Sequence, residues 1–511
     1  MIVKTYGSAV FGVDAQTIQV EVDVSKGIKY FMVGLPDNAV RESQQRIEAA
    51  LKNTGFAISR KKIIINLAPA DIKKEGSAYD LPIAMGILAA SEQLSAELLE
   101  AYIIMGELSL DGSLQPIKGA LPIAIQARKE KFKGIILPKE NANEAAIVND
   151  LEVIGVENLT EAVDFLNGDL SIPPTIIHTR EIFQSNSAVF GEDFADVKGQ
   201  ENIKRAMEIA AAGGHNVILI GPPGAGKTML AKRLPTILPP LNLHEALETT
   251  KIHSVSGHLP QQAALVAQRP FRSPHHTVSD VALVGGGSHP QPGEISLAHN
   301  GVLFLDELPE FKRTVLEVLR QPLEERRITI SRAKFTVDYP AGFMLIASMN
   351  PCPCGYYNHP DKDCVCAPGM VQRYLNKISG PLLDRIDLHV EVVPVAHEEL
   401  LKKPSGERSE QIRERVIQAR EIQRERFANS GVFNNAQMQS NMVKDYCEID
   451  SASQALLKNA MDKLKLSARA FDRILKVSRT IADLAGSSSI QVEHLAEAIH
   501  FRNLDREDWA G

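Results

Sequence analysis

An apolar strand that runs directly into a glycine-rich loop constrains the fold of this chain more than any other feature. The segment NVILIG (216–221) leads into GPPGAGKT (221–228), and a helical pattern follows. This spacing is typical of a phosphate-binding loop, in which glycines let backbone N–H groups surround phosphate oxygens. We therefore expect an α/β domain with a parallel sheet that binds ATP through Gly221, Pro222, Pro223, Gly224, Ala225, Gly226, Lys227 and Thr228.

Four polar side chains have separate expected roles at this site. Lys227 is expected to contact the β- and γ-phosphates, and Thr228 to offer its hydroxyl to Mg²⁺. A second apolar strand, GVLFLDEL (301–308), delivers Asp306 and Glu307 to its carboxyl end, the edge at which ligands bind in open parallel sheets. We expect Asp306 to hold the Mg²⁺ shell and Glu307 to orient and deprotonate the attacking water. An apolar strand that ends in Asp-Glu is common, so this prediction depends on the upstream loop.

Two further residues could complete the hydrolytic machinery. The segment ASMNP (347–351) ends another buried strand, and Asn350 would position the water beside the γ-phosphate; a single Asn at such a place is otherwise a turn residue. The segment GPLLDRIDL (380–388) places Arg385 just before a strand. Arg385 could reach the γ-phosphate of a neighbouring subunit and stabilise the transition state. The alternative is a salt bridge to Asp384 or Asp387.

Four of the five cysteines lie within 15 residues, in the pattern C-x-C-x9-C-x-C. Thiolates at short spacing favour a closed tetrahedral Zn²⁺ site, although C-x-C is tighter than the usual C-x₂-C. Free reduced thiols or a redox pair are the alternatives, and His359 is a possible substitute ligand. The predicted zinc ligands are Cys352, Cys354, Cys364 and Cys366.

The length of 511 residues predicts two to four domains, because one hydrophobic core does not grow to that size. The strand and helix patterns make this a multidomain α/β chain. Residues 1–168 mix strands and helices without a phosphate loop, and TIQVEVDV (17–24) alternates as a half-buried strand does. Residues 169–190 read as a linker, 191–395 as the nucleotide-binding domain and 396–511 as a helical lid. No 18-residue apolar stretch or signal peptide is present, so we expect a cytoplasmic protein without a membrane span.

The motifs, in this order, resemble those of AAA+ ATPases. The segments RPFRSPHHT (269–277), NPCPCGYY (350–357), SGPLLDRID (379–387) and SARAFDRILKVSRTIADL (467–484) resemble the magnesium-chelatase-like ComM/YifB family of bacteria. This resemblance implies that Asn350 is sensor 1, Arg385 the arginine finger and Arg469 sensor 2. It also implies a hexameric ring that acts as an ATP-driven branch-migration helicase on single-stranded or branched DNA during transformation, alongside recombination proteins.

The N-terminal region carries a second resemblance. Residues 106–141 (GELSLDGSLQPIKGALP…GIILPKEN) are similar to the proteolytic domain of Lon and to the matching domain of RadA, which implies a ribosomal S5 domain 2-like fold. Lon requires a serine nucleophile and a lysine base. Those two positions fall at about Ala78 and Leu121, with Ser77 one residue from the first. We therefore expect the fold without protease chemistry.

Two segments are candidate DNA contacts. Residues 326–343 (RRITISRAKFTVDYPAGF) resemble the hairpin that MCM-like ATPases insert before sensor 1. Arg332 and Lys334 would then face the ring pore and neutralise DNA phosphates; the alternative is a solvated hairpin. RPFRSPHHT could line the pore or a subunit interface. The net charge of −7 counts mildly against DNA binding.

Two other functions compete with a DNA motor. One is a chelatase-type motor that works with a metal-site partner on a tetrapyrrole, and the Lon-like region, absent from the chelatase motor subunit, counts against it. The other is a protein-remodelling AAA+ motor, which the acidic net charge fits slightly better. The residues themselves indicate only an ATP site.

Overall fold

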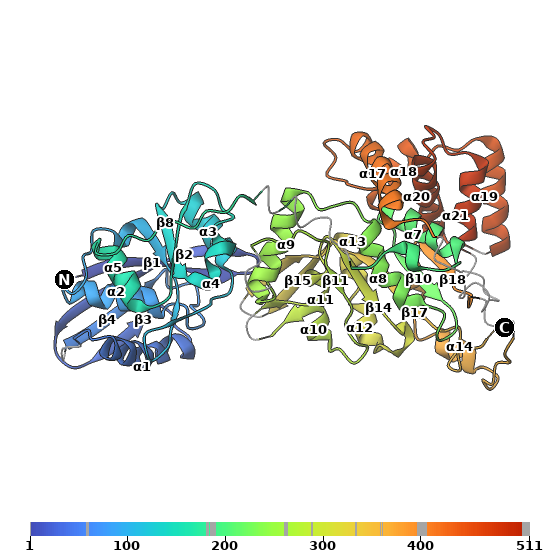
Figure 1. Cartoon of the computed structure of the whole chain (residues 1–511). Coiled ribbons are helices and arrows are strands. Elements are labelled where there is room, and N and C mark those ends of the chain that lie inside the picture. Colours follow the sequence, from blue (N-terminus) through green and yellow to red (C-terminus); the bar gives the residue numbers. More distant parts are fainter. Residues whose placement is uncertain are drawn as a thin grey trace.

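The computed structural model describes residues 2–57, 61–179, 183, 191–259, 264–287, 290–332, 335–357, 359, 361–395, 406–464 and 466–502. The side chains of Arg332 and Phe335 lie outside this description. Three parts follow one another along the molecule: an N-terminal α/β part, a central α/β part, and helices packed on the far end of the central part (Figure 1). The expected α/β class with a central parallel sheet is confirmed.

A seven-stranded mixed sheet forms the N-terminal part. In β2 the side chains of Ile18, Val20 and Val22 are fully buried, as the sequence alternation predicts. All eleven residues of α2 (Asp80–Ala90) are buried against this sheet. The strand order is β3 (Tyr30–Val33), β4 (Lys61–Ala68), β2 (Asp14–Lys26), β1 (Ile2–Phe11), β5 (Tyr102–Ile104), β8 (Gly134–Pro138) and β9 (Glu152–Val156). The other helices of this part are α1 (Asn38–Asn53), α3 (Ala120–Lys129), α4 (Lys139–Ala145) and α5 (Leu159–Asn167).

The central part is built on a five-stranded parallel sheet. Its order is β11 (Phe271–Arg272), β14 (Val302–Leu305), β17 (Met344–Met349), β10 (Val217–Ile220) and β18 (Leu388–Glu391). The residues of β10, β14 and β17 are all buried, because helices and loops cover both faces of the sheet. The glycine-rich loop connects β10 to α8 (Lys227–Ile237). Since the carboxyl ends of parallel strands share one edge, this order brings the loops after β10, β14 and β17 together.

The expected hairpin is present beside this sheet. Strands β15 (Arg327–Arg332) and β16 (Phe335–Pro340) pair antiparallel, and Ile328, Ile330, Val337 and Tyr339 point into the central core. The turn between β1 and β2 reaches the same core, where Val13 packs against it.

The N-terminal and central parts also share apolar and polar contacts. Helix α3 packs on α9 (Leu243–Ser256), and Leu241 and Ala246 join the N-terminal core cluster. The buried carboxylate of Glu144 accepts hydrogen bonds from the Ser254 hydroxyl and from the Leu121 backbone N–H, the latter at 2.8 Å. A buried acid therefore links the two parts.

The C-terminal helices pack on the central part through one continuous core. Helices α17 (Ser409–Arg426) and α20 (Ala468–Leu484) contact α7 (Glu201–Gly213), and residues of all three belong to the same apolar cluster. The arginine-rich helix α17 has only Ser409, Ile412, Val416, Ala419 and Gln423 buried. The remaining helices are α18 (Ser440–Tyr446), α19 (Ser451–Leu464) and α21 (Val492–His500).

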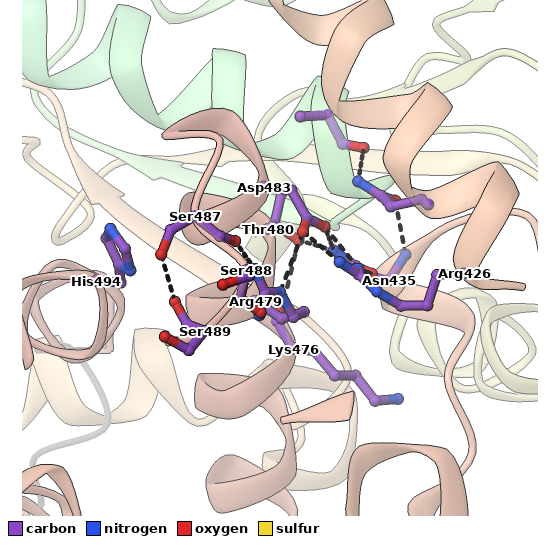
Figure 2. Close-up of polar contacts among 12 residues, drawn as sticks. Arg426, Asn435, Lys476, Arg479, Thr480, Asp483, Ser487, Ser488, Ser489 and His494 are labelled. Carbon is purple, nitrogen blue, oxygen red and sulfur yellow. Dashed lines mark hydrogen bonds and ion pairs between the residues drawn. The ribbon is translucent and has the colours of Figure 1, made fainter. Parts of the chain in front are cut away.

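A buried polar cluster fixes these helices to one another (Figure 2). The Asp483 carboxylate accepts hydrogen bonds from Arg426, from Arg479 at 3.1 Å and from the Asn435 amide at 2.8 Å. The Thr480 hydroxyl lies 2.8 Å from Nε2 of His215, which precedes β10. Because a buried carboxylate needs such partners to be stable, we infer that the cluster joins the C-terminal helices to one another and, through Thr480 and His215, to the central sheet.

None of the helices in the described ranges is both long and apolar enough to cross a membrane.

Candidate active site

The phosphate loop turns sharply at two glycines before α8 begins. Gly224 and Gly226 have φ values of 78° and 87°, in the left-handed region that glycine adopts without strain. The ammonium of Lys227, the first residue of α8, donates to the backbone oxygens of Gly221 at 2.6 Å and Pro222 at 2.9 Å. Burial lowers the pKa of Lys227, while Asp306 and Glu307 oppose this shift. A buried ammonium of this kind is stabilised by an anion at the loop.

The two residues predicted to bind Mg²⁺ are in contact, although one lies in α8 and the other follows β14. The Thr228 hydroxyl donates to Oδ2 of Asp306 at 2.8 Å, although the two are 78 residues apart. Oδ1 of Asp306 accepts from the Ser348 hydroxyl on the adjacent strand β17. A hydroxyl and a carboxylate in contact are the oxygen ligands that Mg²⁺ takes beside nucleotide phosphates. Ser348 was missed from the sequence, where its only signal is a polar residue inside an apolar strand.

The third loop contributes Asn350. Its amide oxygen accepts a hydrogen bond of 3.1 Å from the Lys227 ammonium. The acids that follow β14, Asn350 after β17 and the phosphate loop thus line one cavity of about 420 Å³. Its lining residues are Pro223, Gly224, Ala225, Gly226, Lys227, Thr228, Met229, Asp306, Glu307, Ser348, Met349 and Asn350.

The RPFRSPHHT segment reaches this site through one histidine. Nδ1 of His276 lies 3.5 Å from Oε2 of Glu307, and the His276 ring is tilted by 34° against that of His275, with centroids 4.1 Å apart. The arginines of the segment have partners within the chain: Arg269 donates to backbone oxygens and to Glu245, and Arg272 pairs with Glu294 at 2.6 Å. The segment therefore contacts the carboxylate of Glu307.

Arg385 and Arg469 are not among the residues that line the cavity. The Arg385 guanidinium is buried and pairs with Glu324 at 2.6 Å, and it donates to the backbone oxygen of Pro381. This partner differs from the two acids considered as alternatives, since Asp387 pairs instead with Arg473. Arg469 is exposed in the first turn of α20.

The four clustered cysteines come together immediately after Asn350. Their sulfur atoms lie within 4.8 Å of one another, and Sγ of Cys352 is 3.2 Å from that of Cys354 and 3.7 Å from that of Cys364. A tetrahedral zinc site with Zn–S bonds of ~2.3 Å separates its sulfurs by ~3.8 Å. The cluster is therefore compatible with a zinc site. His359 is not a member of this group.

The two side chains predicted to contact DNA lie outside the described part of the chain. Lys334 lies outside the described residues, and of Arg332 the structure gives the backbone at the end of β15.

The two positions that align with the serine and lysine of Lon form no catalytic pair in the described N-terminal part. Leu121, in the first turn of α3, is buried in an apolar cluster, and Ala78 is half-buried. The hydroxyl of Ser77 donates to the carboxylate of Glu107 rather than to an amine. The absence of protease activity stays a prediction that this geometry supports.

Comparisons with protein families match three stretches of the chain. Residues 193–400 match the family described as magnesium chelatase, subunit ChlI, residues 20–141 match subunit ChlI of Mg-chelatase, and residues 406–502 match the C-terminal family of subunit ChlI. The chain is 46% identical over 505 residues to the competence protein ComM of Haemophilus influenzae, spanning 98% of this chain and 97% of that protein. It is also 46% identical over 506 residues to YifB of Escherichia coli, spanning 98% and 96%.

Two shorter matches are weaker. The chain is 29% identical over 155 residues to Lon protease 2 of Bacillus subtilis, which is 28% of this chain and 27% of the protease. It is 27% identical over 112 residues to the DNA repair protein RadA of Listeria monocytogenes, which is 22% of this chain and 24% of that protein. These matches agree with the Lon and RadA resemblance seen in the sequence.

Proposed function

The chain belongs to the ComM/YifB family of magnesium-chelatase-like AAA+ proteins, and we propose that it is an ATP-hydrolysing ring motor that translocates on DNA and drives branch migration. The observation that carries this proposal is the meeting of the Lys227 ammonium, the Thr228–Asp306 pair and Glu307 around one cavity. Membership of the AAA+ class suggests ATPase activity; the DNA substrate and the ring are part of the proposal.

Each group has a task that follows from its place. Lys227 exchanges its contacts with loop carbonyls for the β- and γ-phosphates, while Thr228 and Asp306 hold Mg²⁺. Glu307, which follows β14, takes a proton from the water that attacks the γ-phosphate. Asn350 already contacts Lys227 and orients that water. The loop amides at the start of α8 stabilise the charge that develops on the phosphate.

In the proposed ring, arginines that do not line the cavity of their own chain complete the site. In a hexamer, Arg385 exchanges Glu324 for the γ-phosphate of the neighbouring subunit, and Arg469, exposed on α20, contacts nucleotide phosphates as sensor 2. The support is that neither arginine lines the cavity of its own chain, that Arg385 lies shortly before β18 and that Arg469 is exposed.

DNA is the proposed substrate, and the motor would act in the cytoplasm on chromosomal DNA. The support comes from the similarity to a protein named as a competence protein and, weakly, to one named as a DNA repair protein. The hairpin β15–β16 would carry Arg332 and Lys334 to the pore, where they contact phosphates without reading sequence. We also propose that Cys352, Cys354, Cys364 and Cys366 hold a structural Zn²⁺ ion.

One experiment tests the function most directly. ATP hydrolysis and strand displacement are measured on a forked and a Holliday-type DNA, with the wild-type chain and with Lys227→Ala. We expect branched DNA to stimulate hydrolysis and to be unwound, and Lys227→Ala to lower both activities by at least about a hundredfold. Stimulation by unfolded protein but not by DNA would instead favour the protein-remodelling motor. A pure protein that neither binds nor cleaves ATP with Mg²⁺ would contradict the whole proposal.

The hairpin is tested by the double variant Arg332→Ala/Lys334→Ala. We expect weaker DNA binding and a shallower salt dependence, because two phosphate contacts are lost, with basal ATPase activity unchanged. Arg327→Ala, at the base of the same hairpin, is the control for loss of a positive charge. Unchanged DNA affinity of the double variant at moderate salt would remove the hairpin from the mechanism.

A further inference from the structure

The segment that carries the four cysteines lies directly against the phosphate loop. Gly355, between Cys354 and Cys364, has a φ of 85°, and a Cβ atom added there would lie 2.5 Å from Cδ of Pro223. Pro223 is one of the residues that line the nucleotide cavity. The backbone of the cysteine segment and the ring of a phosphate-loop residue are therefore in van der Waals contact, with no room for a side chain between them.

A second connection runs through the chain itself. Asn350, which accepts from Lys227, precedes Cys352 by two residues, and Cys352 is completely buried. The backbone oxygen of Cys352 accepts from the Gly355 N–H at 3.0 Å, and its sulfur accepts from the Tyr357 N–H at 3.3 Å. Cys352 thus fixes the turn that places Gly355, and it does so immediately after the predicted sensor 1.

Besides the sulfurs, the side chains that hold the described part of this turn are half-buried or exposed, such as the Tyr356 ring, which contacts His359 and Lys362. Among the described residues of 353–369, no apolar side chain is buried, and Val365 is 83% exposed. A segment without an apolar anchor gains little from burial, so its ordering depends on a cross-link. The sulfurs of Cys352 and Cys354 on one side and of Cys364 and Cys366 on the other lie close enough for a single ion to join them.

We propose that one Zn²⁺ ion held by Cys352, Cys354, Cys364 and Cys366 clamps Gly355 against Pro223, so that the affinity of the phosphate loop for ATP depends on occupancy of the metal site. This inference rests on the proposed ATPase function and adds a regulator of the same site. Four thiolates leave zinc no open coordination position, so the ion has a structural role and takes no part in hydrolysis. Loss of the ion frees the turn, and Pro223 and Asn350 lose their shared support.

The test separates the metal from the contact. Zinc per chain is measured by elemental analysis on purified full-length protein under reducing conditions, and kcat and KM for ATP are measured on the same samples. The variants are Cys354→Ser, which removes a ligand, and Gly355→Ala, which keeps all four ligands but inserts a methyl group against Pro223. Cys447→Ala is the control for loss of a cysteine outside the cluster, since Cys447 is buried near the C-terminal helices.

Gly369→Ala is the matched control for the glycine substitution. Gly369 also has a positive φ, 74°, but an added Cβ meets nothing within 4 Å, so this variant carries the backbone strain without the collision. We expect the wild-type chain and the variants Gly355→Ala, Gly369→Ala and Cys447→Ala to hold about one zinc, and Cys354→Ser to lose it. We expect kcat/KM for ATP to fall by roughly tenfold or more in Cys354→Ser and Gly355→Ala only, mainly through KM.

Several outcomes would overturn the inference. Less than about 0.2 zinc per chain in the reduced wild type, or two disulfides in its place, would remove the metal site. Full loss of zinc in Cys354→Ser with unchanged KM would remove the link to ATP. Equal effects of Gly355→Ala and Gly369→Ala would remove the role of the Pro223 contact. A wild-type chain that holds zinc but neither binds nor cleaves ATP would refute the proposed function and the coupling, and would leave the metal site standing.

Discussion

At the scale of single residues, His276 occupies a place that its own sequence neighbourhood does not explain. It contacts the carboxylate of Glu307 and also packs edge-on against Phe311, so its ring is held from two sides. Glu307 itself has a φ of 55°, an uncommon backbone conformation for a residue with a side chain. A carboxylate in this position needs a neighbour to orient it, and His276 is the group that touches it.

We predict that His276→Ala lowers kcat for ATP hydrolysis by about tenfold or more while KM for ATP changes little, because Glu307 is misplaced and the phosphate loop is untouched. Steady-state kinetics of the two parameters check this. His244→Ala, an exposed histidine on α9 far along the chain from Glu307, is the control. A rise in KM with unchanged kcat would show that His276 acts on nucleotide binding instead.

Site residues that motif spacing identifies could be predicted, whereas a site residue that depends on the order of strands could not. Lys227, Thr228, Asp306 and Asn350 each end or follow a recognisable apolar strand, so their meeting at one sheet edge follows from parallel topology. Their individual roles stay predictions. Ser348 contacts Asp306 only because β17 lies beside β14, and no sequence pattern gives the order of strands.

At the scale of elements, the junction of α4, α3 and α9 contains a titratable group in an apolar setting. Burial raises the pKa of Glu144 above its ordinary value of 4.5, while hydrogen bonds from Ser254 and Leu121 oppose the shift. An acid whose pKa is higher in the folded than in the unfolded state makes folding more favourable when it is protonated than when it is ionised. This contribution is fully present below pH 4.5 and is lost as the pH rises through the raised value.

We predict that Glu144→Gln removes this pH dependence, because the amide keeps a hydrogen-bonding group of the same size without a charge. The melting temperature of the variant minus that of the wild type should increase by about 2–4 °C as the pH rises from 4.5 toward neutrality. Thermal unfolding at several pH values measures this difference, with Glu140→Gln on the same helix as the control. A constant difference at all pH values would contradict it.

Element types were more predictable than element contacts. The alternation of TIQVEVDV correctly predicted β2, and the apolar runs correctly predicted β10, β14 and β17. Within the charged run 407–427, α17 buries only a narrow stripe of its surface. The contact of α3 with α9, by contrast, joins residues more than 100 positions apart, and local periodicity carries no signal for it.

At the scale of the whole molecule, the three parts form an elongated chain in which the nucleotide cavity belongs to the central part (Figure 1). The predicted domain limits at 168, 190 and 395 stay predictions, and the backbone N–H of Thr175, within the predicted linker, donates to Val153 of β9. Arg385 is held by Glu324 of the same chain, and a hexameric ring is the setting in which it would change partner.

We predict that Arg385→Ala lowers ATP turnover by about a thousandfold or more while each chain still binds nucleotide, because the finger acts on a neighbour's transition state. Turnover and nucleotide binding are measured on the same preparation. Arg424→Ala, an exposed arginine on α17, controls for loss of an arginine elsewhere. Turnover at the wild-type rate would show that Glu324 is the permanent partner of Arg385.

The histidine that precedes β10 lies between the C-terminal helices and the phosphate loop. His215 contacts Thr480 on α20 on one side and lies 3.7 Å from Asp387 on the other, and β10 leads from it straight to the phosphate loop. A displacement of α20 would therefore be passed to the strand that precedes the phosphate loop, and a displacement of that strand would be passed to α20. We therefore expect the occupancy of the phosphate loop and the orientation of α20 to change together, because the buried His215 imidazole lies between them.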